Sequence, residues 1–131
     1  MRLVESIQQL VRVNCAAGDF DQAFESLELI DEHVPGDFSK AQFVKGKEYT
    51  LIASKIGAQL SPEKPDAELE ALRAKCLDVA RQTMTKAKEL GYDVVHWSQN
   101  DADLTRYSRN HPESREMLDW IRANWVTDPR V

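Results

Sequence analysis

The chain has 131 residues, of which 42% are hydrophobic and 30% are charged, and its formal net charge is −5. This length and apolar content indicate one globular domain with a moderate core and exclude an intrinsically disordered chain. The lack of a long apolar run or a signal-peptide pattern predicts a cytoplasmic protein, and the acidic balance disfavours nucleic acid and anionic membranes as partners, because both attract clustered cations.

Two helices joined by a tight turn are predicted at the start of the chain. The first, over residues 3–17, follows an apolar stripe at helical spacing that consists of Leu3, Val4, Ile7, Leu10, Val11 and Ala17. Gly18 ends this helix, and Asp19 is placed to cap the next one. The second stripe, which ends before Pro35, consists of Phe20, Ala23, Phe24, Leu27, Ile30 and Val34. Because the connection is so short, the two helices are expected to pack antiparallel.

A second pair of helices is predicted further along the chain. The first of them runs from residue 37 or 38 to about residue 59, and the other runs from about residue 67 to residue 90. The segment 61–66 contains two prolines and is expected to be a loop. Lys45 falls on the apolar stripe of the earlier helix, so we expect its ammonium group to reach out past that stripe to solvent.

The rest of the chain has a different pattern. Residues 92–99 hold a short apolar segment, and a single helical turn is expected from residue 100 or 101 through residue 104. Pro112 follows a cap residue and precedes an acid, Glu113, which predicts a final helix over 112–125. No segment alternates apolar and polar residues for long enough to form a strand, so the predicted fold class is all-α.

These elements predict how the chain is organised. Residues 1–35 are one antiparallel hairpin, and residues 37–91 are a second hairpin of longer helices. Residues 92–125 are interpreted as C-terminal capping helices. Residues 126–131 are interpreted as a frayed tail.

The turn of the first hairpin has a characteristic set of residues, which are Leu10, Gly18-Asp19-Phe20, Ala23, Leu27 and Pro35. This pattern resembles a tetratricopeptide repeat, in which such positions set the tight turn, the close helix crossing and the end of the repeat. The chain departs from the repeat at Val11 and Ile30, where the family has small residues, and at Asn14, where it has an aromatic residue. The second hairpin keeps the repeat spacing only at Ala80, Met84, Ala87 and Gly91.

A series of short motifs follows the second hairpin. They are Ala87-Lys88-Glu89-Leu90-Gly91-Tyr92, Trp97, Asp101-Ala102-Asp103-Leu104, His111-Pro112-Glu113 and Met117-Leu118. This series is similar to the end of repeat regions in many bacterial proteins, some of which carry a serine/threonine kinase domain upstream. The resemblance implies stacked helical hairpins that end in a helical cap, and it supports the fold more than any activity.

Histidine and cysteine spacing gives no metal-binding or nucleophilic motif, so no catalytic residue, cofactor or metal is expected. The three histidines, His33, His96 and His111, are not spaced for a common metal ion. Cys15 and Cys76 each lie within an apolar helical stripe, and we interpret them as reduced core thiols. The sequence alone leaves a disulfide between them open.

Asp101 and Asp103 form a carboxylate pair with two interpretations. Helix capping and turn formation explain both residues. The alternative is a divalent-cation or acid–base site. A small all-α metal-dependent enzyme would then use His96 together with these two aspartates.

Charge is distributed unevenly between the second and third predicted helices. Residues 19–32 hold six acids and no lysine or arginine, whereas residues 40–55 hold four lysines and one glutamate. Within the third helix, Lys40 and Lys47 share one side with Val44 and Leu51. A face that mixes lysines with aliphatic side chains suits an acidic or amphipathic peptide.

We therefore expect a non-enzymatic protein–protein interaction or scaffold domain. In stacked hairpins the first helix of each pair lines the concave side. Arg12, Lys40 and Lys47 are accordingly the predicted contacts to a bound peptide or partner helix. The alternative is a self-associating structural module, a homo-oligomer, because roughly three hairpins are usually needed for stability and this chain has two and a cap.

Overall fold

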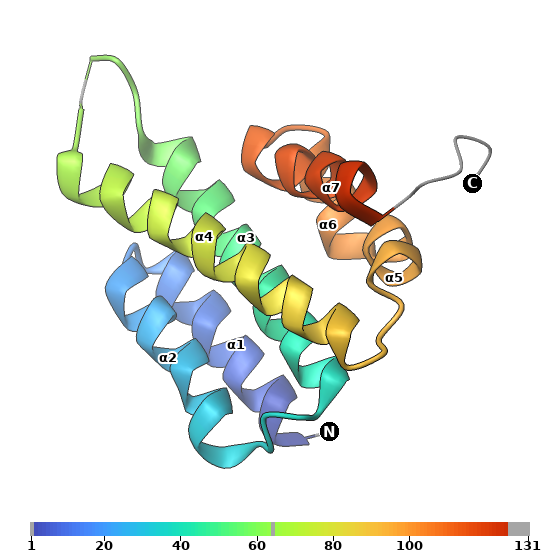
Figure 1. The fold of residues 1–131 in the computed structure, drawn as a ribbon. Helices are drawn as coiled ribbons and strands as arrows, with labels where there is room; N and C mark the ends of the chain where they lie inside the picture. The colour runs from blue at the N-terminus through green and yellow to red at the C-terminus, as the bar shows by residue number, and fades with distance from the viewer. Residues whose placement is uncertain (1, 64, 126–131) are drawn as a thin grey trace.

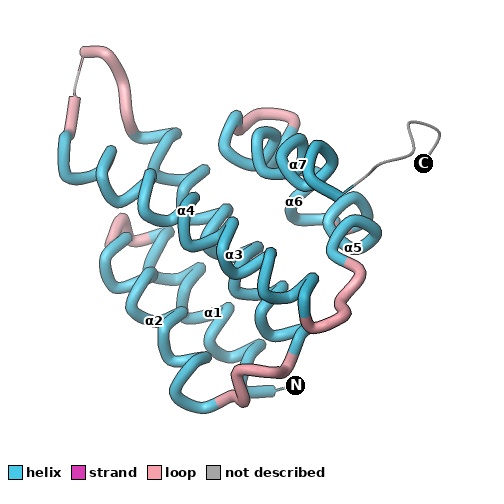
Figure 2. The backbone as a smooth tube through the Cα atoms, viewed as in Figure 1, coloured by secondary structure: helices cyan, strands magenta, loops and turns pink. Residues whose placement is uncertain are grey.

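The computed structural model describes residues 2–63 and 65–125, and this part of the chain contains seven α-helices and no β-strand. The helices are α1 Arg2–Ala16, α2 Phe20–His33, α3 Ser39–Gln59, α4 Ala67–Glu89, α5 Val94–Asn100, α6 Ala102–Ser108 and α7 Pro112–Trp125. Figure 2 shows helices and the loops that join them, and the helices confirm the predicted all-α class. No helix in the described ranges has both the length and the apolar character needed to cross a bilayer. The frayed tail predicted at 126–131 lies outside the described residues.

α1 and α2 form the predicted antiparallel hairpin. Between them Gly18 adopts a φ of 80°, a left-handed conformation that glycine tolerates best. The Asp19 carboxylate caps α2 by accepting a hydrogen bond from the backbone N–H of Gln22 at 3.2 Å. Further along the pair, the side-chain amide of Asn14 donates to the hydroxyl of Ser26 at 3.3 Å. The glycine and the cap predicted for this turn are therefore both confirmed.

The buried face of α1 differs from the predicted apolar stripe. Four residues of this helix belong to the core, and they are Val4, Ile7, Val11 and Cys15. Leu3 and Leu10, which the predicted stripe included, are 43% and 44% exposed. The reason is that α1 is covered by α2 and α3 on one side only. Its apolar residues outnumber the positions on that side, so some of them face outward.

α3 is the central helix of the molecule. It contacts α1, α2, α4, α6 and α7, and 14 of its 21 residues are buried. The α1–α2 hairpin lies on one side of the α3–α4 pair and helices α5–α7 lie on the other (Figure 1). α3 comes close to α4 at Gly46, where an added Cβ atom would lie 2.9 Å from Cγ of Met84. Because most of α3 is surrounded, its buried charged residues need partners inside the protein.

Lys45 is one such residue, and the expectation that its ammonium group reaches solvent is wrong. The residue is only 6% exposed. Its Nζ atom donates to both carboxylate oxygens of Asp31 on α2, each at 2.7 Å. The acidic second helix lies beside α3 and offers a partner, so the ammonium group forms an ion pair at the edge of the core.

The region after α4 is more helical than predicted. Gly91, with a φ of 95°, ends α4 as expected. The apolar segment that follows forms α5, and the single turn expected from residue 101 continues to Ser108 as α6. Asp93 and Asp101 cap these two helices by accepting hydrogen bonds from backbone N–H groups of their first turns.

α7 is the last described helix, and it begins at Pro112, as predicted. It packs against α3, and the hydroxyl oxygens of Ser54 and Ser114 form a buried hydrogen bond of 2.7 Å between the two helices. Near its end, the rings of Trp120 and Trp125 meet edge to face with centroids 5.0 Å apart. Helices α5–α7 lie on the opposite side of α3 from the first hairpin.

Candidate binding groove

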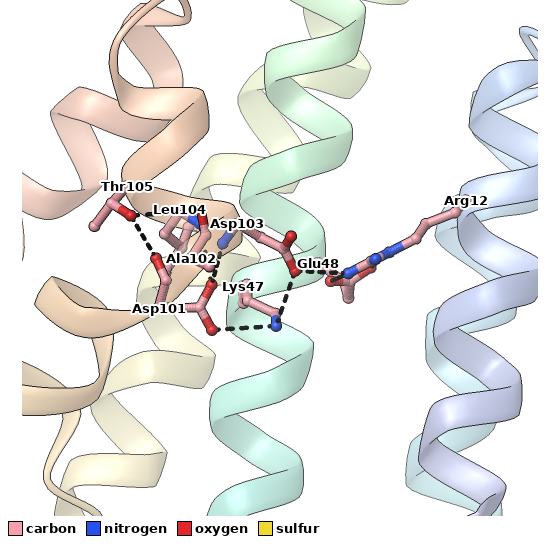
Figure 3. Close-up of polar contacts among 8 residues, drawn as sticks. All are labelled: Arg12, Lys47, Glu48, Asp101, Ala102, Asp103, Leu104 and Thr105. Atoms are coloured by element: carbon pink, nitrogen blue, oxygen red, sulfur yellow. Dashed lines mark hydrogen bonds and ion pairs between the residues drawn. The ribbon is translucent and has the colours of Figure 1, made fainter.

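Two hollows lie along α3, one lined by α1, α3 and α6 and the other by α1, α3 and the loop before α3, and we call them together the groove. Figure 3 shows α3 between α1 and α6, with Arg12 reaching from α1 and with Asp101 and Asp103 at the start of α6. Among the α3 residues that line the groove, five recur every three or four positions, and they are Lys40, Val44, Lys47, Leu51 and Lys55. Two of the predicted contact residues thus come from α3, and the third comes from α1.

Arg12 binds carboxylates from two different helices. Its Nε and Nη2 atoms donate to the two oxygens of Glu48 on α3, each at 3.3 Å, and Nη2 also donates to Asp103 at 2.9 Å. Glu48 is 1% exposed, so its carboxylate depends on this guanidinium for hydrogen bonds that water would otherwise supply. The Arg12 side chain is 48% exposed, so the guanidinium is accessible from the groove.

Lys47 binds the start of α6. Its Nζ atom lies 3.2 Å from an oxygen of Asp101 and 3.5 Å from an oxygen of Asp103. The other Asp101 oxygen accepts hydrogen bonds from the backbone N–H groups of Asp103 and Leu104, both at 3.0 Å. Capping therefore explains Asp101, as predicted, whereas the carboxylate of Asp103 binds Arg12 and Lys47. We call Arg12, Lys47, Glu48, Asp101 and Asp103 the ion network.

The ion network shifts two pKa values. The hydrogen bond to Glu48, which outweighs the opposing effect of burial, raises the pKa of Arg12 above its ordinary value. Burial alone would raise the pKa of Asp103, but the hydrogen bonds and charges of Arg12 and Lys47 outweigh burial and lower it. Both shifts favour the charged forms, so these two groups are ionised at neutral pH.

A hollow of about 210 Å³ opens on one side of the ion network, toward the C-terminal half of α3. Its lining includes the apolar residues Val11, Leu51 and Ile52. Tyr107 of α6 also lines it, with Lys55 Nζ 5.4 Å and Arg106 Cζ 5.8 Å from the centroid of its ring. At these distances both cations are attracted to the ring. The hollow thus combines an apolar and aromatic surface with cationic groups.

A second hollow of about 230 Å³ lies toward the N-terminal end of α3. Its lining includes Val4 from α1 and Phe38, Lys40 and Val44 from α3 and the loop before it. Phe38 is 38% exposed, and Lys40 is exposed as well. The groove therefore has an accessible cation and apolar surface on each side of the ion network.

The structure brings only two of the three predicted contact residues together. Arg12 and Lys47 share the carboxylate of Asp103, whereas Lys40 lies at the second hollow. The sequence did not point to Glu48, Arg106 or Tyr107 as residues of the groove. The available signal for Glu48 was its position next to Lys47. Neighbouring helix residues point about 100° apart, so two adjacent charged residues need separate partners once the helix is buried.

The described residues include no candidate metal site. Among them no three His, Cys, Asp or Glu side chains come together in a group that could hold a metal ion. His96, which the enzyme alternative would use, packs edge-on against Trp97 with ring centroids 5.0 Å apart. The aspartates of that alternative bind Lys47 and Arg12 instead.

The two cysteines are free and buried, as predicted for core thiols. Burial raises the pKa of Cys15 to about 11 and that of Cys76 to about 12. At neutral pH both thiols are protonated, and a protonated thiol is a poor nucleophile and metal ligand. Cys15 also lines the first hollow of the groove.

A second buried carboxylate lies away from the groove, between α4 and α7. Glu113 is 3% exposed, and Arg73 donates to its Oε2 atom at 3.0 Å. Gly57 of α3 leaves the space that this carboxylate occupies, because an added Cβ atom there would overlap it. From the sequence, Glu113 is expected only to be a first-turn acid of the last helix, and its pairing with Arg73 is not predicted.

The fold and the groove define an all-α protein of antiparallel helical hairpins with a charged groove along its central helix. No protein-family model matches the chain, and no curated protein or solved structure matches it significantly. The resemblance to tetratricopeptide repeats therefore rests on the residues named above and stays a prediction.

Proposed function

We propose that the chain is a non-enzymatic, cytoplasmic interaction domain of the tetratricopeptide-like class, which binds an acidic or amphipathic peptide or partner helix in the groove along α3. The observation that carries the proposal is the line of alternating lysines and aliphatic residues on α3, with a hollow on each side of the ion network. Such a line can bind carboxylates and apolar side chains of one extended or helical segment.

The cations at the two hollows contribute most of the proposed electrostatic attraction. Lys40 is exposed at one hollow, and Lys55 lies beside Tyr107 at the other. Peptide carboxylates can approach these groups without breaking an ion pair within the ion network. Apolar peptide side chains would enter the hollows themselves, where they remove apolar surface from water.

Arg12 and Lys47 have a different part in the proposal. Both already bind carboxylates of the chain itself, so they contact a peptide carboxylate only by sharing or exchanging Asp103. The Asp103 side chain is 32% exposed, which allows such an exchange at the groove surface. Glu48 is almost fully buried and stays bound to Arg12.

The proposal is tested with a synthetic amphipathic peptide of about 18 residues, long enough to be helical, with leucines at helical spacing and glutamates beside them. Binding is measured by fluorescence anisotropy of the labelled peptide. We expect the Lys40→Glu/Lys55→Glu variant to bind the peptide at least about tenfold more weakly, because charges lining the groove become repulsive.

The matched control is Arg115→Glu/Arg122→Glu, which makes the same change in net charge on exposed positions of α7. We expect this control to bind the peptide with nearly the affinity of the unaltered chain. Equal weakening by both variants would mean that the peptide responds to net charge alone, and the groove proposal would then be rejected. Absence of binding to the unaltered chain would reject it as well.

A further inference from the structure

The outward side of α1 carries an exposed apolar stripe. Leu3, Leu10 and Val13 are 43%, 44% and 65% exposed. With about 100° of rotation per residue, these residues and Ala17 project from one side of the helix, together with Ser6. Among the side chains that the structure describes, this side of α1 holds no charged residue, whereas 30% of the chain is charged. Three large apolar side chains exposed on one side of a helix form a candidate interaction surface.

The adjacent helix α2 extends this stripe. The hydrogen bond between Asn14 and Ser26 fixes the relative level of the two antiparallel helices. Leu10 precedes Asn14 by four residues, and Leu29 follows Ser26 by three. Because the two helices are antiparallel, both steps run the same way along the pair, so Leu29 is at the level of Leu10 to within about 2 Å along the axis. Leu29 is a partly buried apolar residue, and it widens the surface toward α2.

Acidic residues border the surface on its α2 side. Glu25 and Glu32 are exposed and lie one turn of α2 on either side of Leu29, in the positions i−4 and i+3. Asp21 and Glu28 continue the acidic face of α2, which holds no lysine or arginine. We call Leu3, Leu10, Val13 and Leu29, with Glu25 and Glu32, the hairpin face.

We propose that the hairpin face binds a basic amphipathic helix. The leucines and the valine would pack against the apolar stripe of the partner, and lysines or arginines beside that stripe would pair with Glu25 and Glu32. An acidic helix would bring like charges together here. The hairpin face is therefore complementary to the opposite class of peptide from the groove along α3.

A second copy of the chain is a poorer occupant. If two α1 helices pack antiparallel about a two-fold axis, the α2 side of one copy faces the α2 side of the other. The pairing would then oppose Glu25 and Glu32 of each copy, in a chain whose net charge is already −5. Like charges placed across an interface oppose association.

The test uses two synthetic amphipathic peptides of about 18 residues with the same leucine stripe, one flanked by lysines and the other by glutamates. The affinity of the full chain for each is measured by fluorescence anisotropy. We expect Leu10→Glu to weaken binding of the lysine peptide at least about tenfold. Leu90→Glu is the matched control, because Leu90 is 39% exposed at the end of α4 and lies outside the hairpin face.

The electrostatic part of the proposal is tested by Glu25→Lys/Glu32→Lys. We expect this variant to lose affinity for the lysine peptide, whereas Glu116→Lys/Asp119→Lys, with the same charge change on exposed α7 positions, keeps it. Equal effects of the two double variants, or of Leu10→Glu and Leu90→Glu, would overturn the proposal. So would a dimer of the unaltered chain, seen by light scattering, that Leu10→Glu abolishes, because a second copy would then occupy the face.

Discussion

The first hairpin and the central helix differ in how many of their sides contact the rest of the protein. α1 is covered on one side and leaves Leu3, Leu10 and Val13 exposed on another. α3 is covered by five helices, and it buries most of its apolar residues together with Lys45, Lys47 and Glu48, whereas Lys40 stays exposed. The charged residues of α2 are exposed, whereas the buried charged residues of α3 are matched by carboxylates or a guanidinium from neighbouring segments.

This difference separates two contributions to stability. In the first hairpin, the free energy of folding comes mainly from apolar burial on one side. In α3, ion pairs that would contribute little on the surface become necessary, because a buried charge without a partner is costly. The ion network and the Lys45–Asp31 pair are therefore consequences of the central position of α3.

The largest expected effect on stability comes from comparing a buried leucine with an exposed leucine of the first hairpin. Leu27 is fully buried, so Leu27→Ala is expected to lower the free energy of unfolding by about 2–5 kcal/mol. Leu10 is 44% exposed, so Leu10→Ala is expected to cost less than about 0.5 kcal/mol. Urea unfolding followed by circular dichroism measures both. Similar costs would contradict the assignment of Leu10 to an outward side.

Removal of the Arg12 guanidinium tests whether α3 depends on its ion pairs. Arg12→Met leaves the buried Glu48 carboxylate without its partner, and we expect a loss of about 1–3 kcal/mol in the free energy of unfolding. Arg12→Met/Glu48→Gln is expected to recover part of this loss, because the buried group is then neutral. If the double variant changes the free energy of unfolding by the sum of the changes caused by Arg12→Met and Glu48→Gln alone, the two residues are not coupled.

The close approach of α3 and α4 is tested at Gly46. A Cβ atom there would lie 2.9 Å from Met84 Cγ, so Gly46→Ala is expected to cost about 1 kcal/mol, after the gain in helix propensity is set against the overpacking. Met84→Val shortens the opposing side chain and should reduce the penalty of the alanine. If Gly46→Ala is stabilising in both backgrounds, α3 is not tightly packed at this point.

The smallest expected effect depends on pH. The pKa of Asp103 is lower in the folded protein than its ordinary value of 3.8, so its contribution to stability is complete above that value and is lost as the pH falls through the folded pKa. We expect the unaltered chain to exceed Asp103→Asn in stability by less than about 1 kcal/mol at pH 7. Thermal unfolding at several pH values should show this difference shrinking toward pH 3. A difference that grows in acid would contradict the lowered pKa.

Local signals in the sequence were sufficient for much of the fold. Gly18, Asp19 and Pro112 mark helix ends through their own backbone and side-chain properties, so their positions could be predicted without knowledge of the fold. The outward position of Leu10 could not, because the pattern of α1 has more apolar residues than its covered side can hold. Which of them are buried depends on where α2 and α3 lie.

The candidate site was predictable only in part, for a related reason. Lys40 and Lys47 could be placed on one side of α3 from spacing alone. The partners of Lys47 come from α6, which lies more than 50 residues further along the chain, with Lys47 and Asp101 separated by 54 positions. A pairing over such a distance depends on how the capping helices fold back onto α3, and no local pattern encodes it.

The burial of the two cysteines gives the molecule a pair of internal chemical reporters. Both thiols are protonated at neutral pH, so reaction with a thiol-alkylating reagent requires a fluctuation that exposes them. Cys15 lines the groove, whereas Cys76 is fully buried on α4 and is absent from the lining of the groove hollow. A ligand bound in the groove would therefore slow the alkylation of Cys15 more than that of Cys76. The alkylation rate of Cys76 in the same sample serves as the reference for global unfolding.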